Sequence, residues 1–183
     1  VSWARDVYKR QTIEGVARRC RMNRATIYRQ FGGRESLQSA LLLSEAQKLV
    51  QAMMKSVVSL STPSDVLVEG FVTAMRFARE HPVIQRSVAY EPGAVLGAAT
   101  AKDSALLRLG TTVMSQTVRW AQSRGFAKHM DAEVAGDVLA RLYASYVLMP
   151  GGAHALRTDD DVRAFARKSL LPMFQGTAAS AEP

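Results

Sequence analysis

The hydrophobic residues of this chain recur every three to four positions from Thr12 onward, which is the spacing of amphipathic helices. Glycines, prolines and short polar clusters interrupt the pattern, and no stretch alternates apolar and polar residues as a strand would. We therefore predict an all-α protein. The predicted helices cover about 12–20, 24–31, 34–60, a segment capped by Thr62 or Ser64 and ending near 80, 82–90, 103–123, 131–149 and 159–174, and the Ala/Gly-rich segment up to 101 is a loop or a weak helix.

The first two predicted helices have the spacing of a helix-turn-helix. Ile27 and Phe31 lie on one side of the second helix, and Val16 and Ala17 lie on the matching side of the first. Asn23 stands in the cap position of the second helix, and a glycine pair ends it. The second helix can therefore pack on the first while its opposite side projects into the major groove of DNA.

Positive charge is concentrated in the same region. Residues 1–34 contain nine Lys or Arg and two Asp or Glu, whereas residues 35–183 contain fifteen and fourteen, so nearly all of the net charge of +8 lies at the N-terminal end. A site for a polyanion concentrates its charge in this way, whereas a solubility surface spreads it. A solvated face is the commoner meaning of a run of arginines, but the charge asymmetry, the caps and the spacing together favour a DNA site.

These residues resemble the TetR family of bacterial transcriptional regulators. The resemblance spans Thr12–Leu37 and is carried by Thr12-Ile13, Val16-Ala17, Asn23, Thr26-Ile27-Tyr28, Phe31, Gly32-Gly33, Arg34-Glu35 and Leu37. The residues that it places against DNA are Thr26, Tyr28 and Arg34 at the backbone, and Arg24, Ala25 and Arg29 nearest the base edges. Arginine at a base edge prefers guanine. The free backbone amides at the start of the second helix are also expected to meet phosphate.

Two features depart from the family pattern. Arg21 stands where the turn usually has glycine, and a positive φ there would cost an arginine about 1–2 kcal/mol. The family also has a further helix before this motif, whereas residues 1–11 lack its apolar pattern and are expected to be a fragment end or an artefact of assembly. The predicted domains are 12–45 for the helix-turn-helix, 46–175 for a helical ligand-binding and dimerisation domain, and 176–183 for a disordered tail.

For the later helices, the resemblance implies a small-molecule site between the middle helices and a homodimer formed by the last two long ones. The candidates for the ligand pocket are Phe71, Met75, Met114, Trp120 and Tyr143, with Tyr143 or Thr117 as a polar handle. The helices 131–149 and 159–174 carry apolar stripes, and small residues such as Gly136 and Ala140 allow close approach. Simple core is the commoner meaning of both patterns, and that alternative stays open.

Composition narrows the remaining classes of protein. A hydrophobic fraction of 48%, a charged fraction of 22% and one cysteine, Cys20, are typical of a soluble cytoplasmic protein. The apolar stretches are too short to span a bilayer, so we predict no membrane partner. Three scattered histidines give no nucleophile–base pair or metal-spaced set, and the aspartates at 159–161 suit a helix N-terminus better than a metal. We therefore predict neither an enzyme nor a cofactor or metal site.

The sequence thus predicts a ligand-responsive repressor. It would bind a palindromic operator in double-stranded DNA as a homodimer, and a small apolar effector would release it. The alternative is a helical ligand-binding or dimerisation protein whose DNA-binding head is not competent. Binding of duplex DNA distinguishes the two.

Overall fold

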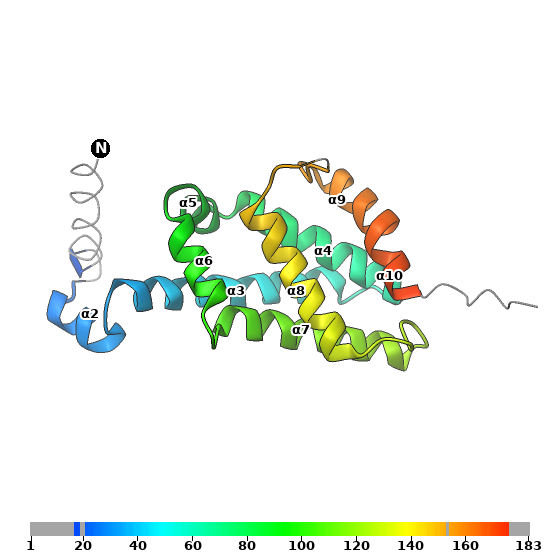
Figure 1. The fold of residues 1–183 in the computed structure, drawn as a ribbon, viewed down its shortest axis with the longest axis horizontal. Helices are drawn as coiled ribbons and strands as arrows, with labels where there is room; N and C mark the ends of the chain where they lie inside the picture. The colour runs from blue at the N-terminus through cyan, green and yellow to red at the C-terminus, as the bar shows by residue number, and fades with distance from the viewer. Residues whose placement is uncertain (1–16, 19–20, 153, 176–183) are drawn as a thin grey trace, which may run out of the picture. The chain divides into compact units, whose positions relative to one another are not determined.

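A computed structural model of the chain describes residues 17–18, 21–152 and 154–175. The described residues form helices and turns and contain no strand, so the predicted fold class is confirmed (Figure 1). The helical elements are α2 (Arg24–Phe31), α3 (Arg34–Val57), α4 (Pro63–Glu80), α5 (Pro82–Tyr90), α6 (Pro92–Thr100), α7 (Ala105–Ser123), α8 (Ala132–Leu148), α9 (Asp159–Phe165), the π-helical segment η1 (Ala166–Leu170) and α10 (Leu171–Gln175). None of the described helices is both long and apolar enough to cross a membrane.

The chain divides into two compact units, one up to Leu41 and one from Leu42 onward. The boundary falls within α3, so the first unit contains α2 and the start of α3, and the second contains the remaining helices. We call them the head and the body. The predicted segments 1–11 and 176–183 lie outside the described residues, as does Val16.

The head is organised around α2. The Asn23 side chain caps the helix by accepting a hydrogen bond of 3.0 Å from the Ala25 amide, and Gly32 ends it at a φ of 74°. Arg21, in the turn before α2, has a φ of 51°, which is the left-handed conformation that glycine usually supplies. The predicted bounds of this helix are therefore confirmed, and the turn does require a positive φ.

The body has two clusters of buried apolar side chains. In the first cluster, Val68, Phe71 and Val72 of α4 pack against Val162 and Leu170 near the C-terminal end. The second cluster joins α7, α8 and α10, and its members are Val118, Ala127, Ala135, Leu139 and Phe174. These contacts bury one face of α4, α7 and α8, as the apolar stripes of these helices require.

Helices α7 and α8 approach closely because small residues line their contact. The Cα of Gly136 faces the Ser115 backbone, and a Cβ placed on Gly136 would lie 2.6 Å from the Ser115 amide nitrogen. Gly110 meets Ala140 at the next turn of the pair, where a Cβ would lie 3.2 Å from the Ala140 Cβ. Gly136 and Ala140, which the sequence offers for close approach, are thus used inside the chain.

Ion pairs join α4 to the C-terminal helices. Asp159 accepts hydrogen bonds from Arg79 and from Arg76, the latter at 2.7 Å, and Arg163 donates to Glu69 at 2.7 Å. Asp161 forms a reciprocal capping box with Thr158, the residue that caps α9. The aspartates at 159–161 therefore lie in the first turn of α9, as predicted, and Asp159 and Asp161 also make the specific contacts described here.

Three element boundaries differ from the prediction. The segment Pro92–Thr100 is a regular helix, α7 begins at Ala105 with Ser104 as its cap rather than Asp103, and α3 ends at Val57 rather than near Leu60. The predicted helix 159–174 also contains a π-helical segment. Pro172 follows two residues after this segment, and its nitrogen cannot donate to the carbonyl of Lys168 four residues earlier.

Candidate nucleic-acid interface and ligand cavity

Helix α2 has a buried face and an exposed face. Ile27 is only 4% exposed and packs with Ala17, while Phe31 and Leu37 close the small core of the head. The packing of Ile27 and Phe31 on Ala17, predicted from their spacing, is therefore present. The opposite face of α2 is held outward by this contact.

The predicted DNA-binding residues occupy that outward face and the start of α3. Ala25 and Arg29 are exposed, Tyr28 is 39% exposed, and Thr26 is half-buried. Arg24 is the first residue of α2 and Arg34 the first residue of α3, and their side chains lie outside the described part of the structure. Arg29, in the last turn of α2, adds a described positive charge to the outward face of this helix.

The backbone amides of this surface differ between the two helices. At the start of α2, Asn23 already accepts from the amides of Ala25, Thr26 and Ile27, at 3.0, 2.9 and 3.2 Å. These amides are satisfied within the protein, so the expectation that they are free for phosphate is wrong. The first backbone hydrogen bond into α3 runs from Leu37 to the Gly33 carbonyl, so the first turn of α3 keeps amides that can face an anion.

The body contains a cavity of about 440 Å³ that opens to the surface, a size typical of small-molecule sites. Its walls come from α3, α4, α5, α6, α7 and α8, and most of its lining side chains are apolar. Among the predicted pocket residues, Phe71, Met114 and Tyr143 line it, and so does Thr117. Residues that the sequence analysis did not select include Leu49 and Met53 of α3 and Val95 and Leu96 of α6. The signal for the α3 residues was present, because their stripe continues beyond what the head can bury.

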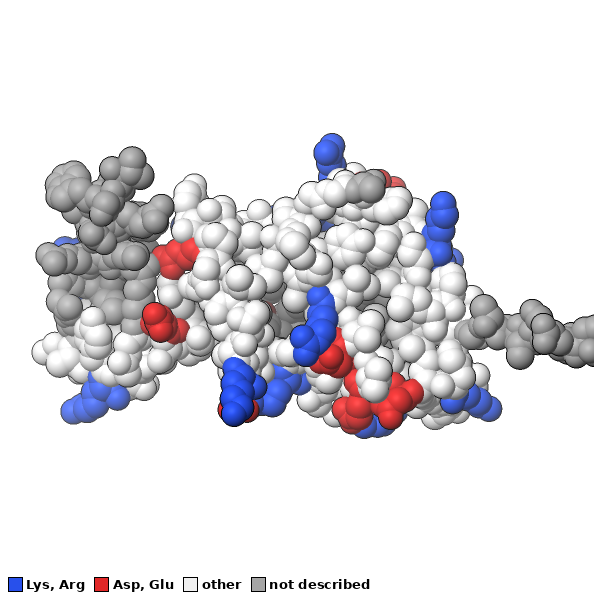
Figure 2. Space-filling model, in the orientation of Figure 1, with Lys and Arg blue, Asp and Glu red and all other residues white. Residues whose placement is uncertain are grey.

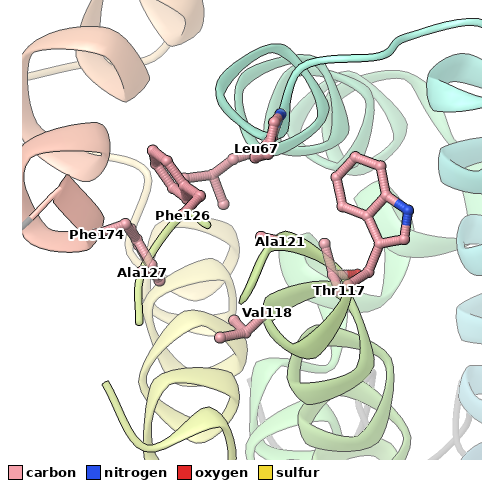
Figure 3. A pocket seen from close by; sticks show the side chains of 9 residues that line it. Leu67, Thr117, Val118, Ala121, Phe126, Ala127 and Phe174 are labelled. Atoms are coloured by element: carbon pink, nitrogen blue, oxygen red, sulfur yellow. The ribbon is translucent and has the colours of Figure 1, made fainter. Parts of the chain in front are cut away.

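The other two predicted pocket residues lie elsewhere. Met75 is buried in the first core cluster of the body. Trp120 borders a separate niche of about 10 Å³ between α4, α7 and α10, which has room for about one water molecule (Figure 3). The Arg124 guanidinium lies 4.0 Å from the centre of the Trp120 ring, a cation–π contact.

A buried glutamate, Glu45, lies outside the cavity beside the partly exposed His81, between α3 and the corner of α4 and α5. Glu45 is 3% exposed. Its Oε1 lies 2.8 Å from the Lys48 ammonium, and its Oε2 lies 3.2 Å from the His81 Nε2. His81 ends α4, precedes α5 and stacks on Phe77 with ring centres 4.5 Å apart. The histidine that ends a helix in the sequence thus also links the corner to α3.

The surface of the body has both charged and apolar regions. In the space-filling view, acidic and basic side chains of the body gather along one edge, and much of the visible face is uncharged (Figure 2). Helix α8 contributes two exposed apolar residues one turn apart, Val134 at 62% and Val138 at 42% exposure. These valines stand on a different side of α8 from Gly136 and Ala140, which pack on α7.

Comparison with known proteins identifies the class of fold. No family model matches the chain. The structure is nevertheless similar to the crystal structure of a TetR family repressor, with a TM-score of 0.62 and 20% sequence identity over 85% of this chain and 82% of the other. The chain therefore has the all-helical fold of a TetR family repressor, in agreement with the resemblance at Thr12–Leu37.

The particular relatives are few and distant. The repressor of known structure is AlkX from Dietzia sp., which is implicated in the biodegradation of n-alkanes. Two sequence relatives, both uncharacterized helix-turn-helix-type transcriptional regulators from two strains of Mycobacterium tuberculosis, are 22% identical over 166 residues, which is 91% of this chain and 76% of theirs. This chain is therefore similar, in fold and in sequence, to transcriptional regulators.

Proposed function

We propose that this protein is a DNA-binding transcriptional repressor whose affinity for its operator is controlled by a small apolar molecule. The observation that carries the proposal is the outward face of α2, which is fixed by the burial of Ile27 against Ala17 and bears Ala25, Tyr28 and Arg29. A helix held in this way can enter the major groove. The names of the relatives and the concentration of positive charge in residues 1–34 support it.

The proposed DNA contacts fall into two groups. Thr26, Tyr28 and Arg34 bind the DNA backbone, where Arg34 and the first-turn amides of α3 share one phosphate. Arg24, Ala25 and Arg29 face the base edges. Contacts of the first group set the affinity for every sequence, and those of the second group set the preference among sequences.

Binding of the full chain to a fluorescent DNA duplex, measured over a salt series, tests this function. The affinity should fall steeply with salt, with a log–log slope of about −0.9 for each phosphate contact. Arg34→Ala should reduce that slope by about one contact, and Arg29→Ala should also relax the preference among duplexes of different sequence. Lys102→Ala removes an equal charge from an exposed site in the body and should leave the slope unchanged.

The outcome that contradicts the proposal is an absence of salt-dependent binding to any duplex. The chain would then be a helical ligand-binding or dimerisation protein with a head that does not bind DNA. Equal effects of Arg34→Ala and Lys102→Ala would show that general electrostatics, rather than this surface, carries the binding.

We further propose that the protein acts as a homodimer through α8 and the C-terminal helices. Val134 and Val138 support this, because they form an exposed apolar stripe on a helix whose small residues are already packed on α7. A twofold dimer presents two heads to a palindromic operator, with half-site centres about 34–36 Å apart or a multiple of that distance. Light scattering should give the mass of a dimer, and Val138→Glu should shift it to that of a monomer.

Val58→Glu is the matched control for the dimer, since Val58 is also exposed but lies just after α3. A monomeric wild-type protein, or an equal response of the two variants, would contradict this interface.

The cavity of the body supplies the site for the effector. Release from DNA requires that the effector bind more tightly to the arrangement of the dimer that does not fit the operator.

A further inference from the structure

Tyr143 is a largely buried polar residue in the wall of the cavity. It lies in the middle of α8, and its ring packs against the first core cluster of the body while the residue also lines the cavity. Burial raises the pKa of its hydroxyl. The phenol is therefore a neutral hydrogen-bond donor at any pH at which the protein would work.

The Tyr143 hydroxyl has no hydrogen-bond partner among the described residues. Among the described side chains, the polar atoms that are fully enclosed and lack a hydrogen-bond partner belong to Glu45 and His81. The Tyr143 oxygen is not one of these atoms, so it keeps some accessible surface. Because this residue is largely buried and lines the cavity, we take that surface to face the cavity. A phenol stands too far from its own helix to bond a carbonyl there, so its partner is either water or another molecule in the cavity.

Other polar side chains of the wall have different arrangements. Thr117 donates to the Val113 carbonyl at 2.9 Å, and Thr100 donates to the Leu96 carbonyl at 2.8 Å. Serines 87 and 145 also line the cavity, and hydroxyls as short as theirs can turn back to their own helices. Tyr143 therefore differs from these hydroxyls in needing a partner from outside its helix.

Charge is nearly absent from the cavity wall. Arg141 is the permanently charged residue in its lining. Its guanidinium donates to Asp137 at 2.6 Å, and its side chain is 63% exposed. A carboxylate or ammonium group placed deep in this cavity would thus lose its hydration without gaining an unpaired partner of opposite charge. An uncharged molecule avoids this cost.

We infer that the cavity takes a mainly apolar, uncharged molecule with one hydrogen-bond acceptor, of the kind provided by a ketone or an ester, and that Tyr143 donates to this oxygen. This inference rests on the proposed function, because it concerns the effector of the same cavity. The inference predicts different affinities for three ligands of equal length, namely a ketone, an alkane and a carboxylate. The expected preference is for the ketone.

The test measures the binding of methyl octyl ketone, decane and decanoate to the full chain by the thermal stabilisation that each produces. The wild-type protein should bind the ketone more tightly than decanoate. Tyr143→Phe should weaken ketone binding about tenfold and leave decane binding unchanged, as expected for one hydrogen bond. Tyr90→Phe, at a tyrosine that is 73% exposed and outside the cavity, should leave all three affinities unchanged.

A purely structural role for the hydroxyl gives a different result. Tyr143→Phe without ligand should unfold at the same or a higher temperature than the wild type, because the lost hydroxyl has no partner in the protein. Clear destabilisation of ligand-free Tyr143→Phe would overturn the inference. The inference would also be overturned if the variant kept the ketone affinity, if decanoate bound more tightly than the ketone, or if none of the three ligands bound.

Binding of duplex DNA, measured on the same preparations, distinguishes this inference from the proposed function. Protein that binds DNA with the expected salt dependence but shows no preference for the ketone refutes the ligand class alone. Protein that binds the ketone through Tyr143 but does not bind DNA refutes the regulatory function and leaves the ligand class in place.

Discussion

Gly136 is the position at which one added methyl group should have the largest effect on the body. A Cβ there would lie 2.2 Å from the Ser115 Oγ, 2.6 Å from the Ser115 nitrogen and 2.9 Å from the Thr111 carbonyl oxygen. The hydroxyl can rotate away, but the two backbone atoms cannot. Relative to the 3.4 Å at which ordinary van der Waals contact begins, the Ser115 nitrogen is about 0.8 Å too close, so α7 and α8 would have to separate.

The cost of Gly136→Ala follows from two opposing effects. Overpacking a close contact typically costs about 1–3 kcal/mol, and backbone obstruction places this site near the upper end. Alanine is better than glycine in a helix by roughly 1 kcal/mol, which offsets part of that cost. The expected net loss is about 2 kcal/mol in the free energy of unfolding, or roughly 4–8 °C in Tm for a chain of this size.

Urea denaturation followed by circular dichroism measures this change, and Gly97→Ala is the matched control. Gly97 lies inside α6, and a Cβ there would meet no atom within 4 Å. Only the helix propensity changes, so Gly97→Ala should raise stability by about 0.5–1 kcal/mol. If Gly136→Ala were stabilised as much as Gly97→Ala, the close approach of α7 and α8 would be refuted.

Three further predictions concern the cap of α2, an ion pair and the core. Asn23→Ala should cost the head about 1 kcal/mol, visible as faster amide exchange in α2, because the Ala25 amide loses its acceptor. The pKa of Glu69 is lowered by its hydrogen bond to Arg163, so its carboxylate stabilises the fold above the unfolded pKa, and this stabilisation is lost as the pH falls through the lower folded pKa. Glu69→Gln should therefore flatten the acidic part of a curve of stability against pH. An unchanged curve would contradict this prediction. Leu170→Ala should cost about 2–5 kcal/mol in urea denaturation, since Leu170 is fully buried, and a cost near zero would show that it is not part of the core.

The elements that the sequence predicted well are those with strong local signals. The bounds of α2 follow from Asn23, whose side chain caps the helix, and from Gly32, which adopts the left-handed conformation that ends it. For the segment that forms α6, the sequence predicts a loop or a weak helix, because alanine and glycine give no amphipathic stripe, and in the structure none of its residues is buried. The start of α7 was misplaced by two residues because Asp103 and Ser104 are both good caps, and only the hydrogen bond from the Leu107 amide to the Ser104 side chain distinguishes them.

The ligand cavity could be predicted only in part, because its position depends on how helices rotate about their axes. Phe71 and Met75 lie one turn apart on α4 and both belong to the first core cluster, yet Phe71 also lines the cavity and Met75 does not. Periodicity identifies the buried side of a helix but not which neighbour each buried residue meets. The sequence also cannot indicate that the Tyr143 hydroxyl is unpaired, because a tyrosine gives the same sequence pattern whether or not its hydroxyl has a partner.

The apolar and small residues of helix α8 make different kinds of contact, which the sequence of the helix alone does not distinguish. Its small residues, among them Gly136, pack on α7, Tyr143 faces the cavity and the first core cluster, and Val134 and Val138 remain exposed. Glu133, Asp137 and Arg141 form a charged row along another side of α8. Val134 and Val138 are the exposed apolar residues of α8 that the fold of one chain leaves uncovered. The proposed dimer therefore depends on these valines rather than on the small residues, and a charge placed at Val138 tests the interface without disturbing the packing of α7 on α8.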